Sequence, residues 1–334
     1  MHLKIVTKTD WPSFKNVAEG VRDALQGTCT CSVSDWNEVT PGGQILFIGT
    51  LDNETLNFLS HVLRESDVVF YATTEGVSRL AGSSRRIAKS LKVVAVSDFV
   101  KQMIEQLGIS VVGVVHHGID MRRADIDSQF KADMPKAGCR TVFLTVSANH
   151  RRKGLDQLLN AFRIVEEHDP ESFLILHSEP QGYYDLEGLI QSLGIERIWS
   201  TNLFGQTTQT QLNALYEACT SYVQSSHSEG FGLPVLEAFR FDKPSIAVDA
   251  PPFNEIVEQG RNGILIPSQG VTWFDFQDSI SFKLHLYTAE DLAEAMGVIA
   301  SDRKLLERMR GNIRDEKWSW DSQRLYPALL QYFN

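Results

Sequence analysis

Residues 228–239 read Ser228-Glu229-Gly230-Phe231-Gly232-Leu233-Pro234-Val235-Leu236-Glu237-Ala238-Phe239, so that two carboxylates stand eight positions apart around a glycine-rich turn. Pro234 suits the first turn of a helix, where its missing N–H costs nothing. The apolar residues after it predict a helix over 233–241. Glycines let backbone N–H groups approach a ligand, and the N-terminus of a helix attracts anions. The stretch therefore predicts a phosphate-binding loop between two carboxylates.

A purely structural interpretation of this stretch stays open. Glu229 would then complement the positive end of the helix dipole, and Glu237 would lie exposed on the helix. The setting favours binding, because Ser221–Gln224 reads as a strand. A strand, a glycine-rich loop and a helix in this order form a phosphate cradle. A phosphate held between two carboxylates that accept hydrogen bonds from hydroxyls suits a nucleotide sugar.

The composition indicates an ordinary globular protein. The chain has 334 residues, 43% hydrophobic and 22% charged, which is enough for two domains with their own cores. A net charge of −10 argues against a nucleic-acid partner, which would need a basic surface. The four cysteines show no metal-ligand spacing and are expected as reduced thiols in the cytoplasm. No signal peptide and no apolar run of ~20 residues is present, so we expect a cytoplasmic protein without a transmembrane segment, with peripheral membrane contact left open.

Short apolar runs alternate with amphipathic stretches along the chain, which predicts an α/β protein with parallel sheets covered by helices. In the first half the predicted strands are Leu3–Val6, Ile45–Ile48, Val68–Tyr71, Val93–Val96 and Val111–Val115, and the predicted helices are 13–25, 53–65, 76–90 and 98–107. In the second half the predicted strands are Thr141–Val146, Phe173–His177, Ser221–Gln224, Ser245–Val248 and Gly263–Ile266, and the predicted helices are 154–167, 184–193, 208–219, 233–241 and 253–259.

We expect two doubly wound domains that face each other across a cleft. An N-terminal domain over 1–120 would be followed by a polar linker at 121–140 and a C-terminal domain over 141–312. Each domain would bind its ligand at the C-terminal ends of its strands. Scattered aromatic residues at 268–286 indicate a loop packed over the second domain or, alternatively, an aromatic contact for a ligand.

Three consecutive cations, Arg151, Arg152 and Lys153, precede a predicted helix. The N-terminus of a helix is already positive, so each cation there costs about 0.3–1 kcal/mol unless an anion is bound. A diphosphate would resolve the conflict. A solvated basic turn is the alternative.

Two further groups of residues follow predicted strands of the first half. His116 and His117 could contact a phosphate or a sugar or act as a general base, or could merely shape the turn into the linker. Two adjacent histidines without a third ligand do not argue for a metal. Thr74 and Glu75 are expected at the cleft, because ligands bind beyond the C-terminal ends of parallel strands. There they could bind acceptor hydroxyls. A threonine at this place could equally cap the next helix. The chain has no P-loop motif and no G-x-G-x-x-G after its first strand.

These residues resemble a known family. The run from Glu229 to Pro234 with Glu237 resembles the E-x7-E signature of the retaining GT-B glycosyltransferases that are grouped as glycosyltransferase family four. Arg152-Lys153-Gly154 is similar to that family's phosphate element, and His117-Gly118-Ile119-Asp120 is similar to its turn at the domain junction. Val96-Ser97, residues 253–257 and residues 263–267 resemble further elements in the family's order. The resemblance is dense over 141–267 and thin before 92.

The resemblance implies a role for each matching residue. Glu237 would bind the ribose hydroxyls, and Glu229 would hold the hydroxyls of the donor hexose. The backbone of Gly230, Phe231, Gly232 and Leu233 would line the donor, and Lys153 with Arg152 would neutralise the diphosphate. The donor would be a UDP- or GDP-sugar, and neither a metal nor a further cofactor would be needed. The helix over 313–334 would cross back to the first domain.

The chain also departs from the family pattern. The family usually carries an arginine six residues before its lysine, where this chain has Ser147, so Arg151 or Arg152 would supply that charge. A histidine near the reacting sugar is usual in the first domain, where this chain has Tyr71-Ala72-Thr73-Thr74-Glu75. Thr74, Glu75 and His117 are therefore the candidates on the acceptor side. The acceptor class, whether a glycan, a lipid-linked sugar or a small molecule, stays open.

The expected activity is metal-independent transfer of a hexose, with retention of configuration, from a nucleoside-diphosphate sugar to a hydroxyl acceptor. A non-catalytic GT-B subunit that binds a nucleotide sugar or a partner is the alternative. A sugar-nucleotide epimerase of the same fold is a third interpretation.

Overall fold

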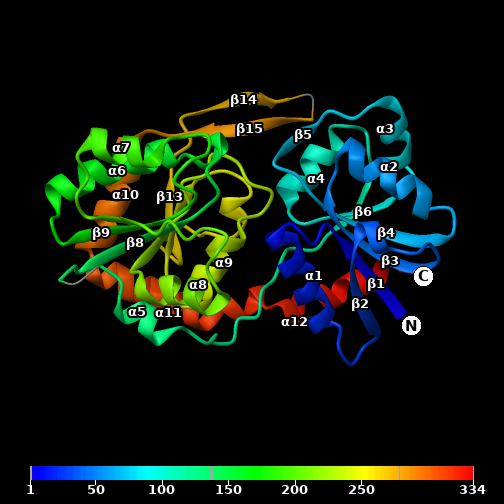
Figure 1. Ribbon diagram of the computed structural model, residues 1–334, viewed down its shortest axis with the longest axis horizontal. Coiled ribbons are helices and arrows are strands. Elements are labelled where there is room, and N and C mark those ends of the chain that lie inside the picture. The colour runs from blue at the N-terminus through cyan, green and yellow to red at the C-terminus, as the bar shows by residue number, and fades with distance from the viewer. Residues whose placement is uncertain (1, 136–137, 278, 334) are drawn as a thin grey trace.

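The computed structural model describes residues 2–135, 138–277 and 279–333. Two α/β units lie side by side, each built on a six-stranded parallel sheet against which helices pack (Figure 1). The predicted fold class, with two Rossmann-like doubly wound units, is confirmed. The first sheet takes its strands from residues 2–114 and the second from residues 141–266. The domain limits near 120, 140 and 312 remain predictions.

The first sheet has the strand order β2-β1-β3-β4-β6-β7. Its strands are β1 (His2–Thr7), β2 (Thr30–Asp35), β3 (Gly43–Thr50), β4 (Ser66–Thr73), β6 (Lys92–Ala95) and β7 (Val111–Val114), and its helices are α1 (Pro12–Ala24), α2 (Asn53–Val62), α3 (Gly82–Ala88) and α4 (Asp98–Glu105). Residues 45–48 at the centre of β3 are buried without alternation. This continuous burial is typical of a parallel strand that is covered on both faces.

The second sheet has the order β10-β9-β8-β11-β12-β13. Its strands are β8 (Thr141–Val146), β9 (Ser172–His177), β10 (Ile198–Ser200), β11 (Ser221–Val223), β12 (Ser245–Val248) and β13 (Gly263–Ile266), and its helices are α6 (Leu155–His168), α7 (Leu186–Leu193), α8 (Gln209–Ala218), α9 (Leu233–Arg240), α10 (Ala289–Ser301) and α11 (Arg303–Glu316). The chain winds outward from β8 to β10 and then returns to start again at β11. In sheets of this order, ligands bind where the direction reverses, beyond the C-terminal ends of the strands. This switch point lies between the ends of β8 and β11.

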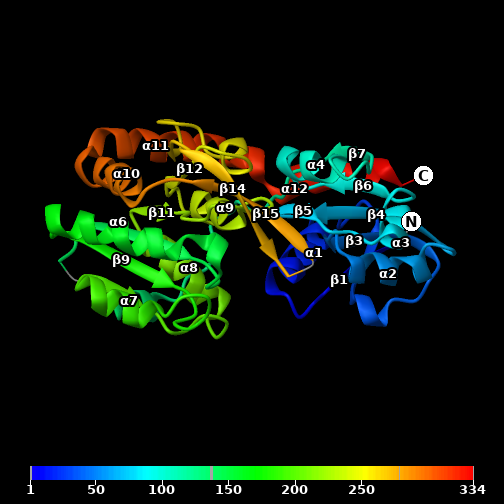
Figure 2. The same ribbon diagram turned by 90° about the horizontal axis from the view of Figure 1, so that it is seen from above.

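Residues 268–286 do not form the expected loop. They form a hairpin of β14 (Gly270–Phe276) and β15 (Ile280–Leu286), and β15 pairs antiparallel with β5 (Gly76–Ser78) of the first unit. The resulting three-stranded sheet joins the two units, and the hairpin lies between them in both views (Figures 1 and 2). The prediction failed because the strand partner lies far away in the sequence, beyond the reach of a local pattern.

Several smaller expectations are corrected. The segment 76–90 is not one helix, because β5 occupies 76–78 and α3 begins only at Gly82. The segment 253–259 holds only a 3-10 turn at Phe253–Glu255, directly after two prolines. The edge strands β2 and β10 were missed, because β2 is half-exposed with a polar sequence and β10 is only three residues long. The linker contains a short helix, α5 (Ser128–Ala132), whose Phe130 ring contacts Trp199.

The C-terminal segment crosses back to the first unit, but not as the single helix expected over 313–334. After α11 come a 3-10 turn (Lys317–Trp320), the short helix α12 (Ser322–Leu325) and a second 3-10 turn (Tyr326–Tyr332). Tyr326 is fully buried and its hydroxyl donates to the Gly118 carbonyl at 2.8 Å. The α12 helix packs on α1, and Figure 1 shows its red ribbon running beneath the first unit. Among the described helices, none combines the length and the apolar character needed to span a bilayer.

The contact between β5 and β15 gives a first prediction. A methyl group at Gly76 would lie 2.1 Å from the Ser281 carbonyl oxygen and 2.8 Å from the Phe282 Cα. Both neighbours are backbone atoms, so Gly76→Ala must push the two strands apart, and we expect it to cost about 1–3 kcal/mol of unfolding free energy. Gly82→Ala is the matched control, because its methyl would meet no atom within 4 Å. Urea unfolding compares the two variants, and equal midpoints would contradict the packing described here.

Candidate active site

Two hydrogen bonds join the two loops at this switch point, one from a side chain and one from the backbone. The Ser225 hydroxyl donates to the Lys153 carbonyl at 2.8 Å, and the His227 N–H donates to the Arg152 carbonyl at 2.7 Å. Gly154 between them has φ +61°, and a methyl group there would lie 2.3 Å from the Ser225 carbonyl oxygen. Only glycine fits this position. The loop after β8 and the loop after β11 are therefore packed closely against each other.

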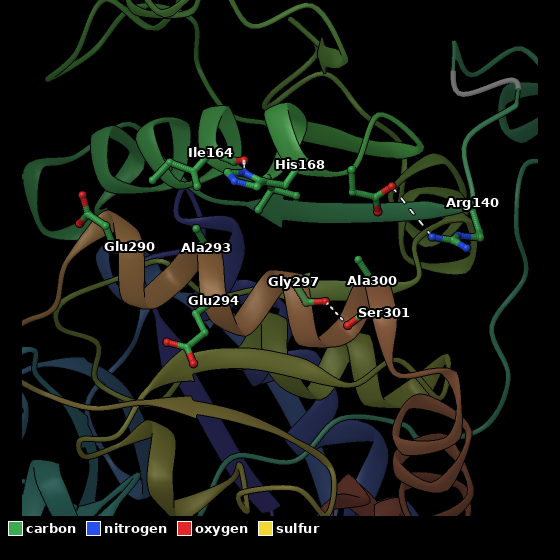
Figure 3. Close-up of a pocket in the computed structure, with 11 residues that line it drawn as sticks. Arg140, Ile164, His168, Glu290, Ala293, Glu294, Gly297, Ala300 and Ser301 are labelled. Carbon is green, nitrogen blue, oxygen red and sulfur yellow. Dashed lines mark hydrogen bonds and ion pairs between the residues drawn. The ribbon is translucent and has the colours of Figure 1, made fainter.

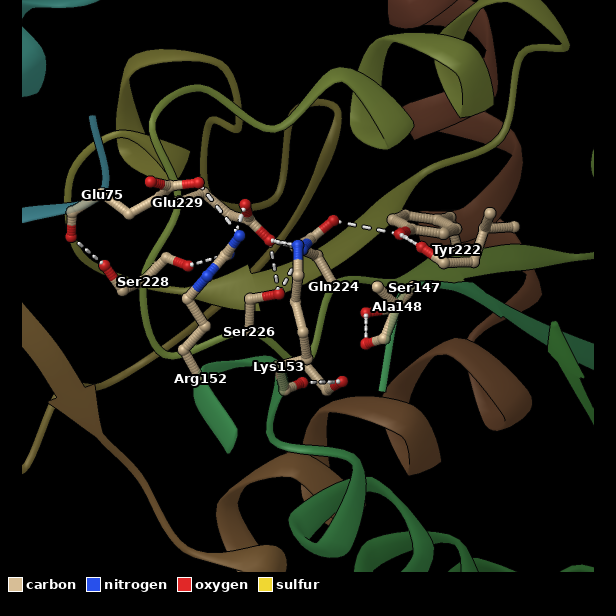
Figure 4. Close-up of polar contacts among 12 residues, drawn as sticks. Glu75, Ser147, Ala148, Arg152, Lys153, Tyr222, Gln224, Ser226, Ser228 and Glu229 are labelled. Carbon is tan, nitrogen blue, oxygen red and sulfur yellow. Dashed lines mark hydrogen bonds and ion pairs between the residues drawn. The ribbon is translucent and has the colours of Figure 1, made fainter. Parts of the chain in front are cut away.

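Glu229 is the centre of a dense cluster of polar contacts (Figure 4). Its carboxylate is buried and forms ion pairs with Arg152, at 2.8 Å, and with Lys153. The Ser226 hydroxyl and the Gln224 side-chain amide donate to the same carboxylate at 2.8 and 3.3 Å. The predicted residues Arg152, Lys153 and Glu229 thus meet at the reversal point of the sheet.

The charges in this cluster shift one another's pKa. Burial by itself would raise the pKa of Glu229, but the adjacent Lys153 and Arg152 outweigh it and lower this pKa to about 2. Burial and the neighbouring Arg152 lower the pKa of Lys153, and Glu229 opposes this only in part. Burial would also lower the pKa of Arg152, but Glu229 and Glu75 raise it above its usual value. Perturbed charges that converge in a crevice are typical of functional sites.

Stability is expected to fall at acidic pH because of Glu229. Its pKa is about 2 in the folded protein against an ordinary value of 4.5, so its contribution is complete above pH 4.5 and is lost as the pH falls towards 2. The difference between these two pKa values corresponds to about 3 kcal/mol of unfolding free energy. Urea unfolding at several pH values should show a steeper loss in the wild type than in Glu229→Gln, whose amide does not ionise. Equal pH slopes would argue against the assigned ion pairs.

Glu237 lies on α9, apart from these ion pairs. It is half-buried, its carboxylate accepts a hydrogen bond from the Tyr216 hydroxyl at 2.6 Å, and burial raises its pKa. Tyr222, whose ring centre lies 5.8 Å from that of Tyr216, donates to the Gln224 side chain at 3.0 Å. Because Gln224 also donates to Glu229, a chain of side chains links the two carboxylates of the motif.

The first unit closes the site from the opposite side. Glu75, at the end of the loop after β4, accepts a hydrogen bond from Arg152 at 3.0 Å, and its carbonyl accepts one from the Ser228 hydroxyl at 2.6 Å. The Ser97 hydroxyl donates to the Gly230 carbonyl at 2.8 Å. Arg152 therefore forms an ion pair with one carboxylate from each unit, Glu75 and Glu229.

The two other acceptor-side candidates, Thr74 and His117, are buried and contact other groups of the protein. The Thr74 hydroxyl is buried and donates to the Gly76 carbonyl at 2.9 Å. Burial and the adjacent His116 lower the pKa of His117 to about 3. Its ring lies 3.1 Å from the Tyr71 hydroxyl and edge-on to Phe231, which is itself buried. Of the three candidates, Glu75 contacts the cation cluster directly.

The other predicted binding residues surround the cluster. Gly232 has φ +110° and precedes the first residue of α9, Leu233. Ser147 is buried just after β8, and its hydroxyl donates to the Ala148 carbonyl at 3.1 Å. The guanidinium carbon of Arg151 lies 4.3 Å from the centre of the Phe274 ring.

Several residues of the site carried no signal in the sequence. Gln224, Ser226 and Ser228 flank the motif, but polar residues in a loop are common and their contact with Glu229 or Glu75 depends on the fold. Tyr216, on the preceding helix, holds Glu237 through a tertiary contact. A search for polar residues at the C-terminal end of β11 would have found Gln224.

One group of possible metal ligands exists among the described residues, formed by Asp98, His116 and Glu255, whose ligand atoms lie within 4.8 Å of one another. Glu255 already accepts hydrogen bonds from the backbone N–H groups of Asp98 and Phe99, each at 2.9 Å, and lies 3.2 Å from the His116 ring nitrogen. It thereby caps α4 of the first unit from the second unit. This capping role explains the cluster without a metal.

A surface hollow lies elsewhere (Figure 3). It has a volume of about 560 Å³ between α6 and α10 and is lined by residues such as His168, Glu290 and Ser301. Arg140, also at its edge, directly precedes β8, so the hollow lies near the start of that strand, whereas the cation cluster follows its end. None of the predicted site residues lines it.

The fold and this cluster define a class of protein with two Rossmann-like units and a group of paired charges at the switch point of the second. The chain belongs to the family of glycosyl transferases group 1, whose model matches residues 127–297. This places the protein among the transferases.

Individual relatives agree with the family. An uncharacterized glycosyltransferase of Sulfolobus islandicus rod-shaped virus 1 is 23% identical over 274 residues, which are 79% of each chain. The trehalose synthase of Thermococcus litoralis is 30% identical over 158 residues, 45% of this chain and 36% of that protein. The crystal structure of Anabaena HepE in complex with UDP and glucose has a TM-score of 0.73 at 17% identity and covers 99% of this chain and 98% of that chain. The structure of the sucrose-phosphate synthase of Thermosynechococcus elongatus has a TM-score of 0.70 at 14% identity. The match covers 100% of this chain and 98% of that chain.

Proposed function

We propose that this protein is a retaining glycosyltransferase of the E-x7-E type, in family four, that transfers a hexose from a nucleoside-diphosphate sugar to a hydroxyl acceptor. The observation that carries the proposal is the meeting of Arg152, Lys153 and Glu229 between the ends of β8 and β11. A UDP-sugar is the preferred donor class, because the similar HepE structures hold UDP, UDP with glucose, or UDP-glucose.

Glu229 forms ion pairs with both cations. A diphosphate carries more negative charge than one carboxylate, so its arrival would draw Lys153 and Arg152 to the phosphate oxygens. Glu229 would then be free to accept hydrogen bonds from the hexose hydroxyls. Glu237 would bind the ribose hydroxyls, and the backbone of residues 230–232 together with the N-terminus of α9 would line the donor.

The chemistry would depend on charge stabilisation. Negative charge develops on the leaving diphosphate, where Lys153 and Arg152 are already fixed in a partly buried site, so no metal ion is needed. The acceptor proton would pass to the departing phosphate oxygen on the same face of the sugar, with retention.

The alternative function is a subunit that binds a nucleotide sugar without turnover. It is favoured by the first unit, where Thr74 and His117 are both buried and engaged. Tight donor binding without release of nucleoside diphosphate, across a broad acceptor panel, would support it.

The test is a screen of purified full-length protein against UDP- and GDP-hexoses, with and without EDTA. Thermal unfolding detects binding, since a donor at 100 times its Kd adds about 2.7 kcal/mol of stability. Release of nucleoside diphosphate detects turnover, and NMR of the product gives the anomeric configuration. Absence of binding by every donor, or activity abolished by EDTA, would overturn the corresponding part of the proposal.

A further inference from the structure

The β14–β15 hairpin has two different faces. Side chains alternate between the faces of a strand, so the directly paired Phe274 and Phe282 share one face with Phe276. Trp273, paired with Lys283, lies on the opposite face. We call Phe282, Phe274 and Phe276 the aromatic row.

The aromatic row begins at the cation cluster. Phe282 pairs with Gly76, next to Glu75, and its ring centre lies 5.7 Å from the guanidinium carbon of Arg152. The Phe274 and Phe282 ring centres are 6.3 Å apart with nearly parallel planes, and the Phe276 ring follows at 6.0 Å from Phe282. Exposure increases along the row, from half-buried Phe282 to Phe276, which is 45% exposed. The row therefore leads from the site to the surface.

Arg151 places a polar group over one ring of the row. Its guanidinium carbon lies 4.3 Å from the centre of the Phe274 ring, and its side chain is exposed. Among the described residues, no carboxylate forms an ion pair with Arg151, in contrast to Arg152 and Lys153. Its five N–H donors are available to a ligand that lies over the rings.

We propose that the aromatic row is the acceptor subsite and that the acceptor is a saccharide that stacks on Phe276 and accepts hydrogen bonds from Arg151, whose guanidinium covers Phe274. This inference rests on the proposed function. A sugar ring has an apolar C–H face and a rim of hydroxyls. Such a ligand fits flat aromatic surfaces with one fixed polar group beside them. Because the row starts at Arg152, a saccharide on it would direct its end towards the proposed hexose site.

A membrane surface fits the same hairpin less well. Its exposed apolar side chains are divided between opposite faces, with Val271 and Trp273 on one and Phe276 on the other. Asp275 on the same strand is paired with Arg79, and the chain carries a net charge of −10. Helices or hairpins that bind at bilayers usually combine one apolar face with basic residues.

The experiment compares Phe276→Ala and the double variant Phe274→Ala/Phe276→Ala with Trp273→Ala on the opposite face. With UDP-hexose as donor, release of UDP to water is measured alone and then with glucose- and N-acetylglucosamine-containing di- and trisaccharides. Binding of the same saccharides to each protein is followed by ligand-observed NMR. We expect at least one saccharide to be used, with its KM raised tenfold or more in the double variant. The ratio of transfer to hydrolysis should fall in parallel and stay unchanged in Trp273→Ala.

Each outcome decides the proposal. An unchanged saccharide KM in both phenylalanine variants, or an equal loss in Trp273→Ala, overturns the assignment to this face. Donor turnover without binding or use of any saccharide overturns the acceptor class and leaves the proposed function standing. Binding of phosphatidylserine vesicles that is lost in the phenylalanine variants assigns the row to a membrane instead. Saccharide binding lost in the double variant, together with absent donor binding, would retain the subsite and remove the proposed function.

Discussion

Lys153→Ala is expected to slow hexose transfer by about 10²–10³-fold, the loss typical of removing one fixed group that stabilises developing negative charge. Lys153 is partly buried beside Glu229 and Arg152, where water screens its charge poorly. The effect should fall on kcat, because the leaving diphosphate gains charge in the transition state. Initial rates over a range of donor concentrations measure it.

Arg151→Ala is the control for the change of charge at this turn. It removes the same charge from the same turn, but its side chain is exposed and directed to the hairpin. A much smaller change in kcat is expected when release of UDP to water is measured without a saccharide, because the ligand proposed for Arg151 is the saccharide. If both variants lose activity equally, or if Lys153→Ala changes only the donor KM, Lys153 does not act on the leaving group.

Glu229→Ala is expected to destabilise the protein without a donor by about 3–5 kcal/mol, because it leaves two partly buried cations without their shared carboxylate. Added UDP should restore much of this loss, since its phosphates would replace the missing negative charge. The shift in thermal midpoint on adding UDP should therefore be larger in Glu229→Ala than in the wild type. Hexose transfer should be lost in both conditions.

Glu75→Ala provides the comparison, because Glu75 contacts Arg152 from the other unit and is more exposed than Glu229. Its removal leaves Arg152 paired with Glu229, so both the destabilisation and the response to UDP should be smaller. A Glu229→Ala protein with wild-type stability, or without an enhanced response to UDP, would contradict the placing of the diphosphate at these cations.

The fold could be predicted largely from local sequence. Strands β8, β12 and β13 begin and end where the apolar runs do, and α9 begins at Leu233, beside the expected Pro234. Buried parallel strands and helix starts leave such signals because they are set by neighbouring residues. The cations at 151–153 and the motif at 229–237 were recognisable for the same reason, as each follows a predicted strand.

The rest of the site depends on contacts between distant residues. The bond from Arg152 to Glu75 and the pairing of β15 with β5 join the two units, and no local pattern reports either. The hairpin also carries aromatic residues on both faces, with Trp273 on one and Phe274 on the other, so its sequence lacks a clean alternation of apolar and polar residues. Local reasoning consequently described it as a loop.

The return of the C-terminal segment affects the order in which the protein can be completed during synthesis. The Tyr332 carbonyl accepts a hydrogen bond from Lys92, its hydroxyl lies close against Gly113, and Tyr326 is buried against the first unit. These residues leave the ribosome after both sheets have been made. Domains usually fold in order from the N-terminus. Here part of the surface of the N-terminal unit stays uncovered until the C-terminal segment has been made. The second unit is therefore the first that can close its core.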